Sequence, residues 1–185
     1  MKATGIVRRI DELGRVVIPK EIRRTLRIRE GDPLEIFVDR EGGVILRKYS
    51  PIGELGDYAE EFAAALHRSL GCVCAVCDRD VFIAAAGVPK KELVGRPVHE
   101  QLDNVMRERI RAIASAASGE AVIPVAAGED EPAYTAELIV PVVSSGDPIG
   151  AVILLSKERG AAFGEAHLKA CETAAGFMGR QLEDR

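Results

Sequence analysis

Charge divides the chain into a short basic segment and a longer acidic one, and this division constrains the fold more than any other feature. Residues 1–50 hold 12 Lys and Arg against 8 Asp and Glu, whereas residues 51–185 hold 13 against 21. The net charges are +4 and −8, which together give −4. A small module of one sign attracts a polyanion even when the whole chain is acidic. We therefore expect a DNA-binding domain at 1–50, a linker at 51–53 and a regulatory domain at 54–185.

The basic segment has the pattern of four short strands around one short helix. Pro19 marks the start of a helix from residue 20 to 26 or 27. A proline has no backbone N–H, and at the first helical position this group would have no partner within the helix. Fifty residues without disulfides or a metal cannot bury enough apolar surface for stability, so we expect two copies to pair and share strands. The runs rich in β-branched residues predict strands at 4–10, 15–18, 33–39 and 44–49.

Basic side chains in this segment form two sets. The set on the helix follows an i, i+3, i+4, i+7 spacing, which predicts one shared face. The other set flanks the turn at residues 11–14, with Arg8 and Arg9 before it and Arg15 after it. A guanidinium group donates two parallel hydrogen bonds to a phosphate or a guanine edge. A solvated helix face would explain the first set equally well, but the second set and the charge division favour DNA. The candidates are Arg8, Arg9, Arg15, Lys20, Arg23, Arg24 and Arg27.

The same segment resembles the AbrB-type transcription regulators of spore-forming bacteria. The resemblance rests on KATGIVRRIDELGRVVIP at residues 2–19, followed by EIRRTL at 21–26. It implies a swapped-hairpin β-barrel, formed as a homodimer, that binds double-stranded DNA. In that family the matching arginines contact the DNA, which makes four residues the main candidates and the other three weaker ones. The four are Arg8, Arg15, Arg23 and Arg24.

The acidic segment has the pattern of a second, α+β domain. It predicts a roughly five-stranded, mostly antiparallel sheet with flanking helices, whose order and size resemble a GAF domain. The whole chain then resembles regulators of forespore genes in which a GAF-like domain follows the AbrB-like one. Helices are expected at 54–70, 98–117 and 163–183, and strands at 72–77, 81–86, 121–127, 134–143 and 149–156.

The first and last of these helices each carry an apolar seam. Pairing of the seams makes a homotetramer plausible, with two barrel dimers bridged through the second domains. The second domain could also hold a small ligand between sheet and helices, or its interior could be filled by side chains. The sequence favours neither, and it identifies no ligand-binding residue.

Catalytic and metal-binding patterns are missing from the sequence. Three cysteines cluster at 72–77, but on a strand Cys72 and Cys74 would face one way and Cys77 the other, so packed thiols are favoured over a metal site or a redox switch. The three histidines are scattered, and no phosphate-binding glycine loop is present. We therefore expect no enzyme, no metal and no cofactor.

No apolar run approaches the roughly 20 residues that a membrane span needs, so we expect no membrane contact and a cytoplasmic, nucleoid-associated protein. Two other functions stay open. One is a ligand-sensing signalling or assembly protein that does not touch DNA. The other is an antitoxin, although antitoxins typically end in a disordered acidic tail and this tail has the pattern of a folded domain.

Overall fold

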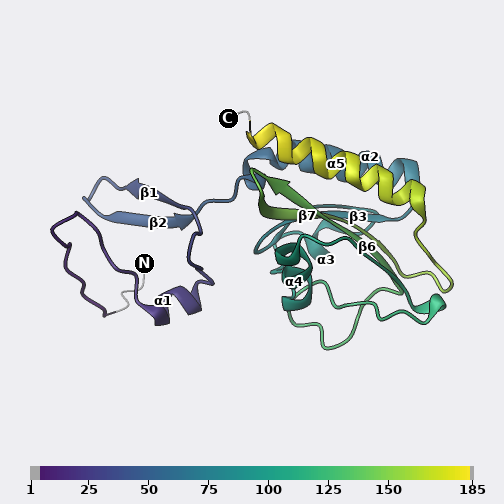
Figure 1. The fold of residues 1–185 in the computed structure, drawn as a ribbon, viewed down its shortest axis with the longest axis horizontal. Helices are drawn as coiled ribbons and strands as arrows, with labels where there is room; N and C mark the ends of the chain where they lie inside the picture. Colours follow the sequence, from purple (N-terminus) through teal and green to yellow (C-terminus); the bar gives the residue numbers. More distant parts are fainter. Residues whose placement is uncertain (1–4, 184–185) are drawn as a thin grey trace. The chain divides into compact units, whose positions relative to one another are not determined.

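The computed structural model describes residues 5–183, apart from the side chains of 54 and 55. The chain separates into two compact units, Met1–Tyr49 and Ser50–Arg185, which are described separately (Figure 1).

The first unit contains one helix and one hairpin. Helix α1 spans Lys20–Thr25 and begins directly after Pro19, as predicted. Strands β1 (Leu34–Val38) and β2 (Val44–Lys48) pair antiparallel, also as predicted. Asp39 shapes the turn between them, because its Oδ1 accepts hydrogen bonds from the N–H groups of Glu41 at 3.0 Å and Gly43 at 2.7 Å.

The strands expected at 4–10 and 15–18 are not formed. Thr4 lies outside the described residues, and residues 5–10 and 15–19 are irregular in the structure. The physical reason is that β1 and β2 pair only with each other in a two-stranded sheet. Backbone groups with no neighbouring strand cannot form a ladder, so these β-branched runs stay irregular in a single chain.

The second unit is a five-stranded antiparallel sheet with helices on both faces (Figure 1). The strand order is β4-β3-β7-β6-β5. Helices α2 (Gly56–Leu70) and α5 (Glu165–Glu183) cover one face, and α3 (Lys90–Leu93) and α4 (Glu100–Glu108) cover the other. The strands are β3 (Val73–Asp78), β4 (Phe82–Ala86), β5 (Ala112–Ser115), β6 (Ala136–Ser144) and β7 (Asp147–Ser156).

Two predictions for this unit were wrong. The helix expected at 98–117 ends at Glu108, because Arg109 adopts a left-handed φ of 56°, and the chain then forms strand β5. The run at 121–127 forms no strand. Pro124 interrupts it and removes a backbone donor, and β5 takes the place beside β6 instead.

The expected linker at 51–53 belongs to the second unit. A single 3-10 turn, Ile52–Leu55, opens this unit. Ile52 is completely buried in the core beneath α2 and α5, and Ser50 Oγ donates a 2.7 Å hydrogen bond to Asp78. Pro and Gly mark a turn as readily as a tether, and in this structure they mark the turn that opens the second unit.

Candidate nucleic-acid interface

Arg15 is held by a tight turn that starts at Asp11. The Asp11 N–H donates to the Arg15 carbonyl at 3.0 Å, and the Asp11 carboxylate accepts from the Arg15 N–H and Nε–H, each at 2.8 Å. These bonds, the backbone one first, hold the pKa of Asp11 below its usual range. The ion pair uses only Nε of a side chain that is 68% exposed, so the two Nη groups are available for a phosphate.

Helix α1 presents basic side chains at its start and its end. Lys20 and Arg24 are exposed. Arg27 lies beyond the helix with φ of 53°. The Arg27 N–H donates to Arg24 O at 3.2 Å and the Ile28 N–H to Arg23 O at 2.7 Å, which is the Schellman arrangement that usually takes glycine at the left-handed position. An arginine at this position carries the backbone strain that a glycine would avoid, and it adds a positive charge at the helix end.

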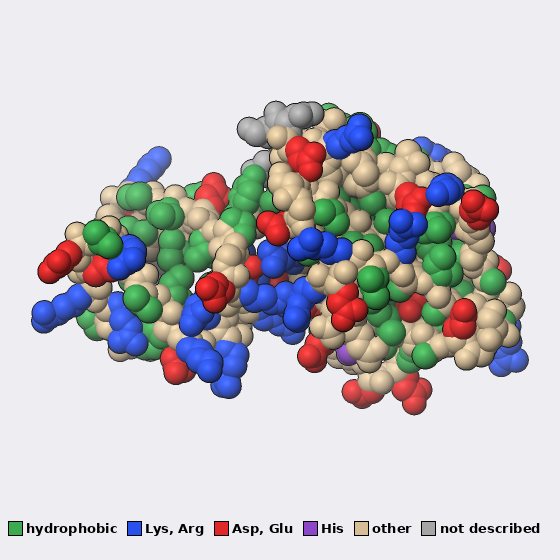
Figure 2. Space-filling view, in the orientation of Figure 1, with side chains coloured by type: hydrophobic (Ala, Val, Ile, Leu, Met, Phe, Trp, Pro, Cys, Tyr) green, Lys and Arg blue, Asp and Glu red, His purple; other side chains and the backbone are tan. Residues whose placement is uncertain are grey.

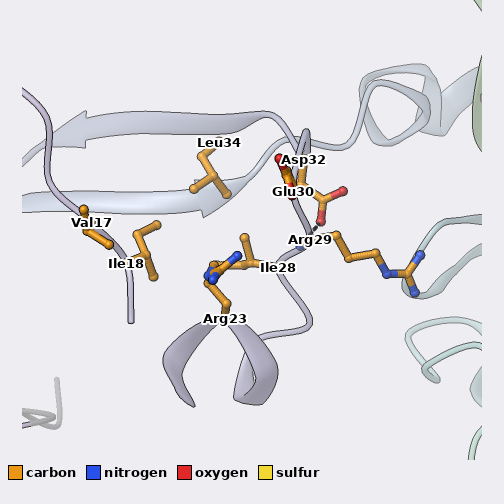
Figure 3. A pocket seen from close by; sticks show the side chains of 8 residues that line it. All are labelled: Val17, Ile18, Arg23, Ile28, Arg29, Glu30, Asp32 and Leu34. Carbon is orange, nitrogen blue, oxygen red and sulfur yellow. Dashed lines mark hydrogen bonds between the residues drawn. The ribbon is translucent and has the colours of Figure 1, made fainter. Parts of the chain in front are cut away.

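Arg23 faces the interior of the first unit. It is half-buried, and it lines an open pocket of about 390 Å³ together with Val17, Ile18, Ile28 and Leu34 (Figure 3). Its Nε is buried and has no hydrogen-bond partner among residues 5–183. Since Arg27 also lies outside the helix, the prediction that the four helical basic residues share one face was wrong. The helix has only six residues, too few for an i+7 position.

Apolar side chains around these cations are open to solvent. On the visible face of the first unit, hydrophobic and basic side chains lie beside one another (Figure 2). Val7 is 85% exposed, Leu13 74% and Val38 73%. A stable monomer rarely exposes so much clustered apolar surface. Further exposed members of this set are Ile6, Ile10, Val16, Val17, Leu26, Ile36, Val44 and Leu46.

The candidate residues therefore divide into two groups. Six of them are exposed, whereas Arg23 is turned inward. The exposed residues are Arg8, Arg9, Arg15, Lys20, Arg24 and Arg27. The sequence did not show this difference, because helical spacing alone cannot say which face packs against the unit.

The second unit buries a carboxylate that its sequence did not assign to any role. Glu137 lies on β6 between Ala114 of β5 and Leu155 of β7, and it is 1% exposed. Its Oε1 accepts a 3.1 Å hydrogen bond from the Ile123 N–H, and Oε2 has no partner among the described residues. Burial raises the pKa of Glu137 to about 7, against the opposing effect of that hydrogen bond. The sequence signal that could have indicated this buried carboxylate was its place as the one charged residue in a mostly apolar strand.

A second polar cluster lies at the edge of the same face. Arg96 Nη1 pairs with Glu129 Oε1 at 3.3 Å, and Glu129 Oε2 accepts from the N–H groups of Val125 and Ala126. The cluster ties the irregular segment after η2 (Ala116–Ser118) to the loop that follows α3.

Helices α2 and α5 share an aromatic contact on their outer side. The Phe177 ring lies 5.2 Å from that of Phe62 and 6.3 Å from that of Tyr58. Tyr58 is 45% exposed and Phe177 39%, so the contact continues the apolar seam predicted for these helices out to solvent. Within the described range, no helix is long and apolar enough to cross a membrane, and no three acidic, Cys or His side chains are grouped to hold a metal ion.

Comparison with known proteins identifies similar proteins for both units. A family model described as stage V sporulation protein T C-terminal, transcription factor, matches residues 54–183. A second model, described as antidote-toxin recognition MazE, bacterial antitoxin, matches residues 7–54. Stage V sporulation protein T of Bacillus subtilis (strain 168) is 57% identical over 183 residues, which cover 99% of each chain.

The first unit also matches a shorter protein. Transition state regulatory protein AbrB of the same organism is 69% identical over 51 residues, which are 28% of this chain and 52% of that protein. The GAF domain from Acinetobacter phosphoenolpyruvate-protein phosphotransferase superposes with a TM-score of 0.57 at 17% identity, covering 70% of this chain and 82% of that chain. The predicted AbrB relation and the predicted GAF-like fold are both confirmed.

Proposed function

Because the chain belongs to the stage V sporulation protein T family, we propose that it is a DNA-binding regulator of sporulation genes that acts as a homo-oligomer. The relative over the whole chain is a sporulation protein, and the model matching the second unit describes a transcription factor. In this proposal residues 1–50 bind promoter DNA and residues 54–185 sense a signal or assemble the oligomer. A cytoplasmic place at the nucleoid follows from that role, and no catalytic step is part of it.

The exposed apolar surface of the first unit is the observation that carries the proposal. Residues 5–19 are irregular in one chain and yet rich in exposed β-branched side chains. If a second copy supplies the missing strand partners, the same side chains and the pocket next to Arg23 become the core of an interlaced barrel. Burial of several such side chains contributes about 1.5–3 kcal/mol each, which offsets the small size of one unit.

Dimerisation also doubles the exposed cations. Arg8, Arg15 and Arg24 then repeat along one assembly, with Arg9, Lys20 and Arg27 as weaker contributors. Each neutralised phosphate releases a counterion, so affinity falls steeply with salt. Arg23 stays a candidate contact, since its guanidinium would need only a side-chain rotation to leave the pocket.

A salt series on the full-length protein tests the DNA contacts. Arg24→Ala should weaken binding to duplex DNA and reduce the slope of log affinity against log salt by about 1 for each lost phosphate contact. Arg159→Ala is the matched control, because Arg159 is an exposed arginine of the second unit and should leave both quantities unchanged. Equal effects of the two substitutions would refute the assigned surface.

Arg23 needs a separate test because it lines the pocket. If it contacts DNA, Arg23→Ala should weaken binding while sedimentation shows the same oligomer as the wild type. If the oligomer dissociates, the side chain is part of the dimer core and leaves the list of DNA contacts.

For the second unit we propose assembly through the aromatic contact of α2 and α5. Two exposed aromatic rings beside each other on neighbouring helices form an apolar surface that a second copy can cover. A homotetramer of two barrel dimers follows from this contact. Native mass spectrometry of freshly purified protein would show both the number of chains and any retained small ligand.

An antitoxin is the second candidate, and the family model matching residues 7–54 supports it. The second unit argues against it, because a folded antiparallel sheet follows where an antitoxin would carry a disordered segment. Co-purification of a toxin with the full-length protein would favour this alternative.

A further inference from the structure

Three of the four cysteines gather where the sheet meets the last helix. Cys74 and Cys171 are completely buried in the core between the sheet and helices α2 and α5, and Cys72 packs against that core. Cys74 Sγ donates a 3.7 Å hydrogen bond to the Cys72 carbonyl. Cys77 lies on the opposite face of β3, with its Sγ 3.8 Å from Met106 Sδ.

The two neighbouring thiols differ in accessibility and in acidity. Cys72 is half-buried, whereas Cys74 is shielded from solvent. The Cys74 side chain lowers the pKa of Cys72, and burial opposes this effect. The pKa of Cys74 is raised, first by the Cys72 side chain and then by burial. An accessible, acidic thiol beside a protonated one is the arrangement of a redox-sensitive pair, in which the first attacks and the second resolves.

The spacing of Cys72 and Cys74 is compatible with a bond between them. In a regular strand, residues i and i+2 point to the same face and lie about 6.7 Å apart, within the Cα separation that a disulfide spans. Cys72 lies in a bend directly before β3, which begins at Val73. His67 Nδ1 donates a 2.7 Å hydrogen bond to its carbonyl and fixes this bend.

We propose that Cys72 and Cys74 form a peroxide-sensitive thiol pair that closes to an intrachain disulfide. The Cys72 thiolate attacks one oxygen of a hydroperoxide and breaks the O–O bond, which gives a sulfenic acid and, after protonation, one water or alcohol. The Cys74 sulfur then attacks the Cys72 sulfur and expels hydroxide, which takes the Cys74 proton and leaves as water. Two thiols are oxidised by two electrons and one peroxide is reduced.

The thiol pair uses no residue of the first unit, and its direct effect would be on helix α2. The Cys72 carbonyl that the disulfide would reorient accepts the hydrogen bond from His67, in the last turn of α2. Because α2 carries part of the exposed aromatic surface, oxidation at Cys72 acts on the helix that we propose for assembly. A short-range disulfide is strained and therefore readily reduced again.

Mass spectrometry of the full-length protein tests the pair directly. After brief treatment with hydrogen peroxide and a catalase quench, the wild type should lose about 2 Da per chain, recover it with dithiothreitol, and yield a peptide bridged from Cys72 to Cys74. Cys72→Ser should abolish the loss, and the residue is exposed enough for the variant to fold. Cys77→Ala should lose the same mass as the wild type, since its thiol lies on the other face.

Cys74→Ser provides the second readout. Without the resolving thiol, the oxidised Cys72 should persist as a sulfenic acid that a 1,3-dione labels. Three results would overturn the proposal: an unchanged mass loss in Cys72→Ser, a bridge from Cys72 to Cys171 or to another chain, or no oxidation of the native wild type under conditions that oxidise the unfolded one.

Discussion

Replacement of Glu137 by Gln should make the protein more stable at neutral and alkaline pH. The wild-type carboxyl must ionise in a site where, within the described part of the chain, one oxygen has no hydrogen-bond partner. The rise of its pKa from 4.5 to about 7, at about 1.4 kcal/mol per unit, corresponds to about 3 kcal/mol of lost stability once both states are ionised. The side-chain amide of the glutamine would keep an acceptor for the Ile123 N–H and carry no charge.

The pH dependence follows from the direction of the shift. Between pH 4.5 and 7 the folded wild type holds a proton that the unfolded chain has lost, so its stability falls as the pH rises through this window and levels off above it. The advantage of Glu137→Gln should therefore be about 3 kcal/mol at pH 8 and below about 1 kcal/mol at pH 5. When the wild type and Glu137→Gln are compared at one pH, the contributions of all other titratable groups to stability cancel.

Urea unfolding followed by far-ultraviolet circular dichroism measures this difference, because α2 and α5 of the second unit supply most of the helical signal. Glu108→Gln is the control, since Glu108 is exposed at the end of α4 and should change stability by less than about 0.5 kcal/mol at every pH. A difference that does not vary with pH, or a Glu137→Gln variant less stable than wild type at pH 8, would refute the reasoning.

Four further substitutions test the packing and the proposed assembly surface. In Gly179→Ala the new Cβ would lie 2.2 Å from the Val143 carbonyl oxygen, so thermal unfolding should show a loss of several kcal/mol, whereas Gly176→Ala meets nothing within 4 Å and should gain about 0.5–1 kcal/mol. Ile52→Ala should destabilise the second unit by about 2–5 kcal/mol in urea unfolding. A change under about 1 kcal/mol would indicate that residues 51–53 are a linker and not part of the core. Phe177→Ser should reduce the number of chains per particle in sedimentation, and an unchanged particle would remove α5 from the assembly surface.

The sequence predicted those elements whose local signals and tertiary partners agree. Pro19 marked the start of α1, and the strands expected at 134–143 and 149–156 form β6 and β7, because these signals act within a few residues. Strand β5 was missed because its alanines favour a helix, and only pairing with β6 overrides that preference. Local propensity cannot report a partner that lies more than twenty residues away.

The candidate interface shows the same limit on what local sequence signals can predict. Charge and the AbrB-like motif identified the cations, because both are properties of residue type and order. The inward direction of Arg23 could not be predicted, since it depends on the pocket that Ile28 and Leu34 line with it. Glu137 was visible as a charge in an apolar strand, but its unpartnered oxygen is a property of the packed structure.

In the proposed function both units depend on self-association, and this dependence offers a route from the second unit to DNA. In our proposal a single first unit has too little core to be stable, so its ability to bind DNA depends on the concentration of its partner. Contact between second units raises that local concentration without any change to the cations. A modest change in the α2 and α5 surface therefore alters the fraction of intact barrels, and hence occupancy of DNA. Signal sensing and assembly, kept as alternatives for the second unit, are then two descriptions of one equilibrium.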